Sequence, residues 1–452
     1  MSYHLLVIGA GLAGCEAALA AAAQGVPVLV REMKPLAYTP AHHSPLMGEL
    51  VCSNSLRSDD PTSAVGLLKL EMSLLGSAVM AAARATAVAA GKALAVDRQA
   101  FAALLDQALR GHPLITLESV AVTEVPRAGL CVLASGPLTT PELAADLARL
   151  TGQAGLHFYD TIAPIVTSES VDMAHAFWAD RYGDGEGDYL NCPLSKEEWQ
   201  AFYQALTTAE QVPLKDFENP RFFEGCLPIE VMAARGEKTL LFGPMKPVGL
   251  SDPATGRWPH AVVQLRKEDH EGRLLNLVGF QTKLTHPAQE RVFRLIPALA
   301  RAEFARLGSI HRNTFVDAPR ALTPDQRLCS APHVYVAGQL SGVEGYVESA
   351  ASGLLCGINA GRRALGQGPL LPPPTTALGG LLSHLGNTAT KDFQPSNVNF
   401  GLLPPLPPQP RRLPKKQRGL ELARRALADL LAWMEASGLT PAMVPPSLQD
   451  LS

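Results

Sequence analysis

The sequence predicts an α/β protein built on a parallel βαβ unit, with an inserted α+β domain and a helical C-terminal tail. Three observations predict it. An apolar run, a glycine-rich turn and an Ala-rich segment follow one another at the N-terminus. The segment 166–308 differs in character from its surroundings and holds three of the four tryptophans. A proline-rich stretch precedes a basic amphipathic helix near the C-terminus.

The composition is that of a folded chain without an overall basic charge. The protein has 452 residues, enough for two or three domains. Hydrophobic residues make up 47% and charged residues 18%, so a sizeable core is expected. The formal net charge is −3. These values exclude wholesale disorder and a protein that coats nucleic acid with its whole surface, but they are compatible with a local basic patch.

The cysteines and the N-terminus indicate a reduced, cytoplasmic protein. The seven cysteines include no CxxC pair, so we expect neither a disulfide framework nor a structural metal site. Four cysteines lie in apolar runs typical of a core: Cys15, Cys131, Cys329 and Cys356. Cys192 fits a structural or a chemical role. No signal peptide is expected, and Glu16 and Gln24 interrupt the apolar stretch 5–30, so we expect no membrane span.

Strands and helices alternate in the first part of the chain. Asp60 and Pro61 are the expected N-cap and first residue of one helix, and Thr140 is the expected cap of another. In order, the expected elements are a strand at 3–8, a helix at 12–24, a strand at 27–32, a loop at 34–60, and helices at 61–77, 98–110 and 142–151.

After residue 308 the pattern returns to buried strands and helices. A strand at 334–336 precedes glycines and a long apolar helix that ends at Leu365. Proline-rich stretches at 372–374 and 404–414 separate it from an amphipathic helix at 418–437. We therefore expect a discontinuous domain at 1–165 and 309–410, an inserted domain at 166–308 and a basic helical tail at 411–452.

The N-terminal glycines form a dinucleotide-binding fingerprint. The motif consists of Gly9, Ala10, Gly11, Leu12, Ala13 and Gly14. Gly9 permits the tight turn, Gly11 lets the backbone approach a pyrophosphate, and Gly14 permits close packing of helix on strand. Glu32 ends the next strand, where its carboxylate can accept hydrogen bonds from a ribose. The motif predicts a Rossmann-like domain, and its position at the N-terminus favours FAD over NAD.

A second glycine-rich segment predicts the closing element of the same site. The strand at 334–336 leads to Gly338 and Gln339, and Gly345 opens the helix that follows. A strand, a glycine and a helix N-terminus aimed at a flavin are typical of glutathione-reductase-like FAD folds. One more βα unit of the sheet is the alternative interpretation. No second GxGxxG motif occurs, which does not favour a tandem FAD and NAD(P)H architecture.

Five segments carry a resemblance to a known family. They are 49–56 with the string CSNSL, 223–230 with EGCLPIE, 242–250 with GPMKPVGL, 338–352 and 393–405. With these strings the chain resembles the folate- and FAD-dependent tRNA (uracil-5-)-methyltransferases, the TrmFO family, which is related to the GidA (MnmG) flavoproteins. The resemblance runs through nearly the full length, and the three strings are far more specific than a glycine fingerprint.

The resemblance implies a reaction. Methylenetetrahydrofolate supplies a carbon to C5 of uridine 54 in the T-loop of tRNA, NADPH or NADH reduces FAD, and the product is ribothymidine. A thiolate that adds to C6 makes C5 nucleophilic, and a second group removes the C5 proton. Cys226 and Cys52 match the functional cysteines of the family. We assign Cys226 as the nucleophile and Cys52 as its partner, and we expect Tyr346 to cover the flavin ring.

Further candidates bind folate and tRNA. For the folate they are Lys283, His286, His311 and Arg312. For tRNA phosphates they are Arg411, Arg412, Lys415, Lys416 and Arg418, at the start of a segment that continues to Arg424 and Arg425. A solvated helix face is the alternative interpretation of this basic segment. We expect a monomer or weak oligomer.

Two other functions remain open at this point. One is the wobble-uridine modification of the GidA-type flavoproteins, which resemble a longer chain with an additional helical domain and a different cysteine motif. The other is a flavin-binding RNA partner without catalytic activity, against which the paired Cys52 and Cys226 argue. The sequence offers no support for an S-adenosylmethionine route, because FAD accounts for the fingerprint.

Overall fold

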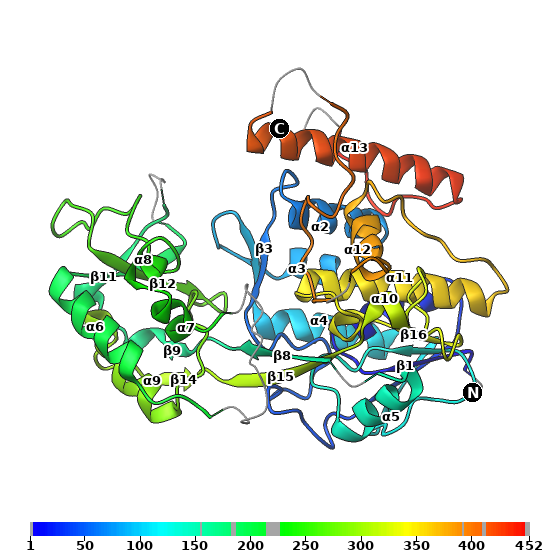
Figure 1. Ribbon diagram of the computed structural model, residues 1–452, viewed down its shortest axis with the longest axis horizontal. Helices are drawn as coiled ribbons and strands as arrows, with labels where there is room; N and C mark the ends of the chain where they lie inside the picture. Colours follow the sequence, from blue (N-terminus) through cyan, green and yellow to red (C-terminus); the bar gives the residue numbers. More distant parts are fainter. Residues whose placement is uncertain are drawn as a thin grey trace.

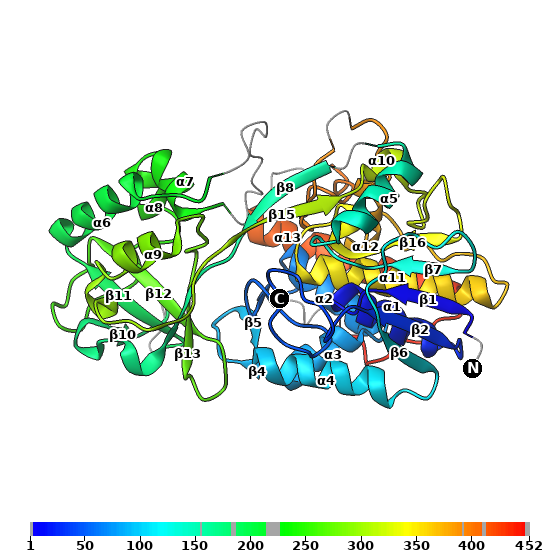
Figure 2. The ribbon, with the colours of Figure 1, turned by 90° about the horizontal axis from the view of Figure 1, so that it is seen from below.

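The computed structural model describes residues 3–153, 156–181, 187–213, 227–390, 393–408 and 413–447. Figures 1 and 2 show two lobes joined by a long antiparallel ribbon, which consists of β8 (Leu156–Thr161) and β15 (Ile310–Phe315). One lobe contains the N-terminus and the C-terminal helices. The other is formed by the middle of the chain. Each lobe has a hydrophobic core of its own.

A five-stranded parallel sheet forms the centre of the first lobe. Its strand order is β16-β7-β1-β2-β6, and every neighbouring pair is parallel. The strands are β1 (Leu5–Ile8), β2 (Val28–Glu32), β6 (Ile115–Ser119), β7 (Cys131–Leu133) and β16 (Val334–Val336). The last of these comes from beyond the second lobe, as the sequence predicted. The predicted Rossmann-like α/β class is therefore confirmed.

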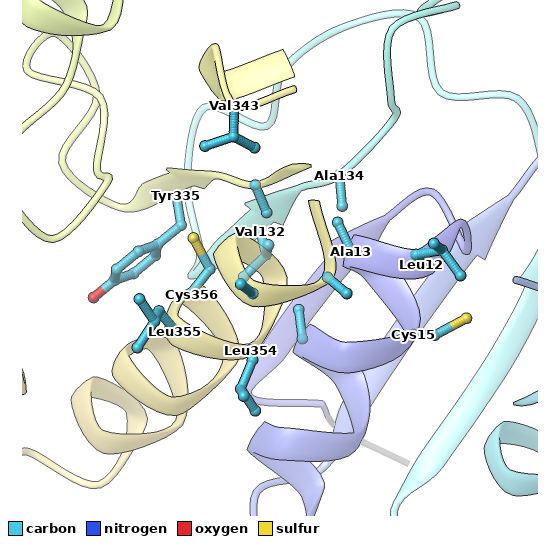
Figure 3. Close-up of a cluster of buried hydrophobic side chains, with 14 of the residues drawn as sticks. Leu12, Ala13, Cys15, Val132, Ala134, Tyr335, Val343, Leu354, Leu355 and Cys356 are labelled. Carbon is cyan, nitrogen blue, oxygen red and sulfur yellow. The ribbon is translucent and has the colours of Figure 1, made fainter. Parts of the chain in front are cut away.

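Two helices far apart in the sequence pack closely against each other. They are α1 (Leu12–Ala22) and α11 (Tyr346–Ala364). A Cβ atom on Gly353 would lie 2.2 Å from the carbonyl oxygen of Ala13, and one on Gly357 would lie 2.4 Å from that of Ala17. Figure 3 shows the resulting contact, with Ala13 facing α11. Only glycine permits the two backbones to approach so closely.

The remainder of the first lobe corrects two expectations. The segment 34–60 contains a strand, β3 (Ser55–Ser58), which pairs with β5 (Ala93–Val96). The expected helix at 61–77 starts later, because the Ser63 hydroxyl caps it by accepting from the amide of Gly66. It also ends earlier, at a break before the next helix. The other elements are α2 (Ala64–Leu74), α3 (Ala78–Ala85), β4 (Ala87–Val88), α4 (Arg98–Gly111) and α5 (Pro141–Thr151), which Thr140 caps as predicted.

The second lobe contains a six-stranded antiparallel sheet in the order β10-β11-β12-β13-β9-β14. Its strands are β9 (Ile165–Thr167), β10 (Phe177–Trp178), β11 (Tyr189–Leu194), β12 (Ala261–Lys267), β13 (Leu274–Leu277) and β14 (Phe304–Arg306). Its helices are α6 (Lys196–Thr208), α7 (Ile229–Ala234), α8 (Glu237–Leu241) and α9 (His286–Phe293). Val263 and Leu265 of β12 belong to the core, whereas Gln264 and Arg266 lie on the opposite face. The exact domain boundaries stay a prediction.

The C-terminal part returns to the first lobe. After α10 (Ala318–Ala321) and α11 come α12 (Ala377–Leu385) and α13 (Lys415–Ala436). Figure 1 shows α13 lying across α2 and α12. Leu427, Leu430 and Met434 of α13 form a small apolar cluster with Leu74 of α2. The predicted helical tail is therefore packed on the first lobe through one face.

One cysteine prediction was wrong. Cys15, Cys131 and Cys356 are buried as expected, and so is Cys192, but Cys329 is exposed. Its neighbour Leu328 is the buried residue, because the chain leaves the core between them on its way to β16. Within the described ranges, no single helix has both the length and the apolar character required to cross a membrane. The bent pair α2 and α3 meets the test by length and composition only.

Two buried carboxylates bind the N-termini of helices. Glu16 on α1 accepts from the Ser77 hydroxyl and from the amide of Val79 at the start of α3. Glu71 on α2 accepts from the amides of Ala377 and Leu378 at the start of α12, both at 2.8 Å. A carboxylate is well placed there because the first amides of a helix have no partner within it. Burial nevertheless raises the pKa of Glu71 to about 8, although these amides lower it.

Replacement of Glu71 tests whether burial raises the pKa of this carboxyl group despite its hydrogen bonds to two amides. The raised pKa means that the folded protein binds a proton more tightly than the unfolded chain, so stability is lost as the pH rises towards 8. Glu71→Gln removes the titration and should reduce this loss between pH 5 and pH 8 by up to about 1.4 kcal/mol per pH unit. Urea unfolding at several pH values measures the slope. Glu197→Gln on the exposed face of α6 is the control, and equal slopes in both variants and the wild type would refute the prediction.

Candidate functional site

A cavity lies at the carboxyl ends of β1, β2 and β7. Such an edge is the usual ligand site of a parallel α/β sheet. Both glycine-rich segments contribute to its wall. Of the residues predicted to bind the cofactor or cover its ring, those that line it are Gly9, Gly11, Leu12, Ala13, Glu32, Gly338, Gln339 and Tyr346. The two motifs are more than 300 residues apart in the sequence, and the fold brings them together as predicted.

The glycines of the fingerprint fit a bound dinucleotide. Gly9 has a φ of +93°, and a Cβ atom there would lie 2.5 Å from the carbonyl oxygen of Ala134. A Cβ atom on Gly14 would lie 1.9 Å from the carbonyl oxygen of Gly9. A Cβ atom on Gly11, in contrast, would meet no protein atom within 4 Å, and Gly11 faces the cavity. The first and third glycines therefore serve the fold, whereas the second leaves room for a ligand.

Glu32 lies between the fingerprint and the cavity. Its carboxylate accepts from the amide of Ala10 at 2.7 Å and from that of Lys34 at 3.1 Å. These contacts fix the carboxylate at the end of β2, where each oxygen retains a free lone pair. The arrangement fits the predicted role of accepting from ribose hydroxyls. Glu32 also has a second role, because its hydrogen bond with the amide of Ala10 orients the glycine loop.

The second motif is fixed by backbone conformation. Gly338 has a φ of +73° and donates from its amide to the Ser352 hydroxyl at 3.0 Å. Gly345 does not line the cavity. It has a φ of +104° and is the residue before α11, where a Cβ atom would lie 2.5 Å from the Glu348 carboxylate. Gly345 therefore permits the turn that starts α11 and places Tyr346 at the cavity wall.

Tyr346 joins the cavity to the CSNSL loop. Its hydroxyl oxygen accepts from the amide of Cys52 at 2.6 Å and from that of Ser53 at 3.3 Å. Burial raises the pKa of Tyr346, and the nearby Cys52 raises it further. The sulfur of Cys52 lies 3.9 Å from the carbonyl oxygen of Thr161 on β8. The structure thus places Cys52 at the edge of the cavity, next to the ring-covering tyrosine that the sequence suggested.

Cys226 lies outside the described residues, as do Glu224 and Gly225, but the last four residues of the motif, 227–230, are described. The buried Glu230 accepts from the Thr282 hydroxyl at 2.9 Å and from the amide of Lys283 at 2.7 Å. The amide of Ile229 donates to the carbonyl oxygen of Gln281 at 2.7 Å. The end of the EGCLPIE string is therefore hydrogen-bonded directly to the segment 281–283. From the sequence, these two segments were assigned separately to a thiol site and a folate site.

The four folate candidates lie on two elements. Lys283 precedes α9, and His286 is the exposed first residue of that helix. His311 and Arg312 lie on β15. His311 is hydrogen-bonded to the Ser309 hydroxyl at 2.9 Å, and its pKa is lowered by burial and by the charge of Arg306. None of the four lines the cavity of the glycine motifs, so their role in folate binding stays a prediction.

Several residues that line the cavity were not predicted from the sequence. These lie mostly in the loop that follows β7 and include Ser135, Gly136, Pro137 and Thr139. The only sequence signal is that Cys131–Leu133 is a short apolar run, and its position beside β1 is seen only in the structure. Lys34, Thr39 and His42 also contribute. They come from the irregular segment after β2, for which local sequence gives no geometry.

The cations of the basic segment 411–425 fall into two groups, those with partners in the protein and those that are exposed. Arg411 and Arg412 lie outside the described residues. Arg424 pairs with Glu421 at 3.0 Å, and Arg425 donates to the carbonyl oxygens of Pro404 and Pro405. The exposed cations are Lys415, Lys416 and Arg418, in the first turn of α13. Cations at a helix N-terminus are unfavourable for the helix, so helix stability does not account for them.

Comparison with known proteins identifies the family. A family model described as glucose inhibited division protein A matches residues 4–368. A methylenetetrahydrofolate–tRNA-(uracil-5-)-methyltransferase TrmFO from Geobacter sulfurreducens is 57% identical over 96% of this chain and 99% of its own length. The TrmFO protein of Geotalea uraniireducens is 56% identical over 95% and 98%.

The fold comparison agrees. The structure of Aquifex aeolicus GidA superposes with a TM-score of 0.69 at 16% identity, covering all of this chain and 75% of the GidA chain. At this identity the likeness concerns the fold alone. The near full-length identity with the two TrmFO proteins is decisive for the family, and it agrees with the CSNSL, EGCLPIE and GPMKPVGL strings. The chain belongs to the TrmFO family.

Proposed function

We propose that the protein is a methylenetetrahydrofolate–tRNA-(uracil-5-)-methyltransferase that methylates C5 of uridine 54 in the T-loop, forming ribothymidine. The single observation that carries this proposal is the junction of the cavity with the CSNSL loop. There a dinucleotide cradle and a cysteine are joined through Tyr346. FAD bound in the cavity supplies the reducing equivalents of NADPH or NADH to the transferred carbon. The tRNA substrate implies a cytoplasmic enzyme, and we expect a monomer or weak oligomer.

The geometry of the cavity supports a set of residues that would hold FAD. The N-terminus of α1 has Gly11 as its N-cap and no side-chain cap, so its first amides are available to a pyrophosphate. The open space beside Gly11 accommodates the phosphates. Glu32 binds the ribose, and Gly338 and Gln339 complete the opposite wall. Tyr346 closes the wall towards Cys52 and excludes water from the reacting carbon.

The two cysteines carry the chemistry at the uracil ring. The thiolate of Cys226 adds to C6, and the electrons of the C5–C6 double bond allow C5 to attack the methylene carbon of the folate. A base then removes the proton at C5, and tetrahydrofolate leaves the transferred carbon with the electrons of the carbon–nitrogen bond. The resulting exocyclic methylene would accept a hydride equivalent supplied by the reduced flavin, and the sulfur leaves C6 as the C5–C6 double bond is restored. Cys52 is the partner in proton removal or in resolution of the adduct. Its backbone contacts with Tyr346 hold it at the cavity edge for this step.

Isotopic labelling tests the reaction. Methylenetetrahydrofolate labelled in its methylene carbon should transfer the label to ribothymidine in tRNA that lacks this modification. Labelled S-adenosylmethionine should transfer none. Cys226→Ala should retain flavin but transfer no label, since it removes the nucleophile alone. Cys52→Ala should slow a later step and accumulate a covalent tRNA adduct, which is detectable on a denaturing gel.

A colour assay with a matched glycine tests the cofactor site. Gly11→Leu places a side chain in the space expected for the pyrophosphate, and the φ of −72° at Gly11 is allowed for any residue. We expect a folded but colourless protein, as measured by thermal unfolding and visible absorbance. Gly111→Leu, where a Cβ atom also meets nothing within 4 Å, should remain yellow. Normal flavin content in Gly11→Leu would refute this placement of FAD.

Salt dependence tests the role of α13. Replacement of Lys415, Lys416 and Arg418 by Gln should weaken tRNA binding and flatten the log–log dependence of affinity on salt. The expected change in slope is about 0.7–0.9 for each phosphate that is no longer neutralised. Flavin content should not change. A variant with Lys196, Lys238 and Arg301 replaced by Gln, all exposed on the other lobe, controls for net charge. The same slope in both variants would contradict a specific role for α13.

A further inference from the structure

The loop that contains Cys52 is surrounded by guanidinium groups. Arg98 donates to the carbonyl oxygen of Leu50. Arg306 donates to the carbonyl oxygen of Val51 at 2.9 Å and to that of Cys52 at 3.2 Å. Arg266 donates to the Ser53 hydroxyl at 2.9 Å and to the side-chain oxygen of Asn54 at 3.1 Å. Five consecutive residues, 50–54, therefore each accept a hydrogen bond from an arginine.

Two of these arginines come from the other lobe. Arg266 lies on β12, on the face of the antiparallel sheet that is turned away from its core, and Arg306 is the last residue of β14. Figure 2 shows this sheet and the first lobe on either side of the ribbon formed by β8 and β15. Arg98, the first residue of α4, belongs to the first lobe. The loop is thus held jointly by both lobes.

This arrangement costs stability, which indicates a function. Glu268 contributes one negative charge against three guanidinium groups, and it pairs with Arg98 at 2.7 Å. Burial lowers the pKa of Arg266 and also that of Arg306, for which the charge of Arg98 adds to the effect. Partly buried cations without matching anions are expensive, and carbonyl oxygens do not neutralise them. A loop that needed only to be folded could be held by uncharged donors.

The two peptide groups on either side of the Cys52 Cα atom are both held at both ends. Arg306 binds their carbonyl oxygens, those of Val51 and Cys52. Tyr346 binds their amides, those of Cys52 and Ser53. The two backbone dihedral angles of Cys52 are the rotations between these two peptide groups. Arg306 and Tyr346 together therefore fix the direction in which the Cys52 side chain leaves the backbone.

We propose that Arg306 is a positioning residue of the methyl-transfer reaction, which fixes Cys52 through the carbonyl oxygens of Val51 and Cys52. The proposal rests on the function proposed above for Cys52. Arg306 does not line the cofactor cavity, and its hydrogen bonds to this loop go to the backbone. Its planar fork binds the two carbonyl oxygens from two different terminal nitrogens in a fixed geometry, which the single ammonium nitrogen of a lysine does not reproduce. The orientation of a catalytic group held in this way is set before the substrate binds.

Steady-state kinetics of Arg306→Ala and Arg306→Lys test the proposal. Arg306→Ala should lower kcat for methyl transfer at least tenfold, while KM for tRNA and for the folate stays within twofold of the wild type. Flavin content and NAD(P)H oxidation should be unchanged. Arg306→Lys keeps the charge but loses the rigid fork, so it should have an intermediate kcat. This loss in kcat alone and its partial rescue are not expected from a role in folding only.

Arg181→Ala is the matched control. Arg181 also lies in the second lobe and donates to a backbone carbonyl oxygen, that of Val248 at 2.8 Å, and to the Gln264 side chain. It should keep the wild-type kcat. A wild-type kcat in Arg306→Ala would overturn the proposal. So would the finding that Arg181→Ala and Arg306→Ala lose kcat to the same extent and thermal stability to the same extent. If the wild-type protein itself transfers no folate label, the proposed function fails instead, which the labelling assay detects separately.

Discussion

The close contact between α1 and α11 is the constraint on which the functional site depends. Gly353 and Gly357 let the backbone of α11 approach Ala13 and Ala17 to a distance that no side chain would allow. This contact fixes where α11 begins, and its first residue is Tyr346. The cavity wall and the support of the CSNSL loop therefore both depend on two glycines in the middle of a helix. The usual cost of glycine in a helix, about 1 kcal/mol each, is offset by this packing.

The helix N-termini of the first lobe divide into two kinds, and the division explains where an anion can bind. The starts of α3 and α12 are closed by serine or threonine caps and by the buried carboxylates of Glu16 and Glu71. The start of α1 has no side-chain cap and opens into the cavity. The same electrostatic preference thus stabilises the fold at two helices and leaves a third free for a phosphate.

The parts predicted from the sequence were those encoded by neighbouring residues. The first βαβ unit, the cap at Thr140 and the return of the sheet at β16 each have a local pattern. β3 was missed because Ser55–Ser58 is a strand only through its pairing with β5. Cys329 was misplaced because one residue decides whether an apolar run is still inside the core. The cavity was predicted from its two motifs, but the loop after β7 was not, because its contribution depends on the order of strands in the sheet.

The arginines around the loop 50–54 could not be predicted either, because their contacts join segments that are distant in the sequence. Through them the second lobe helps to hold a loop of the first lobe. The loop begins before β3, and the carbonyl oxygens of Leu50, Val51 and Cys52 receive no bond from a neighbouring strand in the described sheets. Backbone oxygens in such a position need donors from elsewhere. Arg98 of the first lobe supplies the donor to Leu50. Arg306 at the end of β14 supplies the donors to Val51 and Cys52, and the sequence pattern identifies it only as a polar residue. A sheet that covered the first lobe with uncharged residues would complete the packing, but only Tyr346 would then hold the two peptide groups on either side of Cys52, and it would hold them at their amides alone.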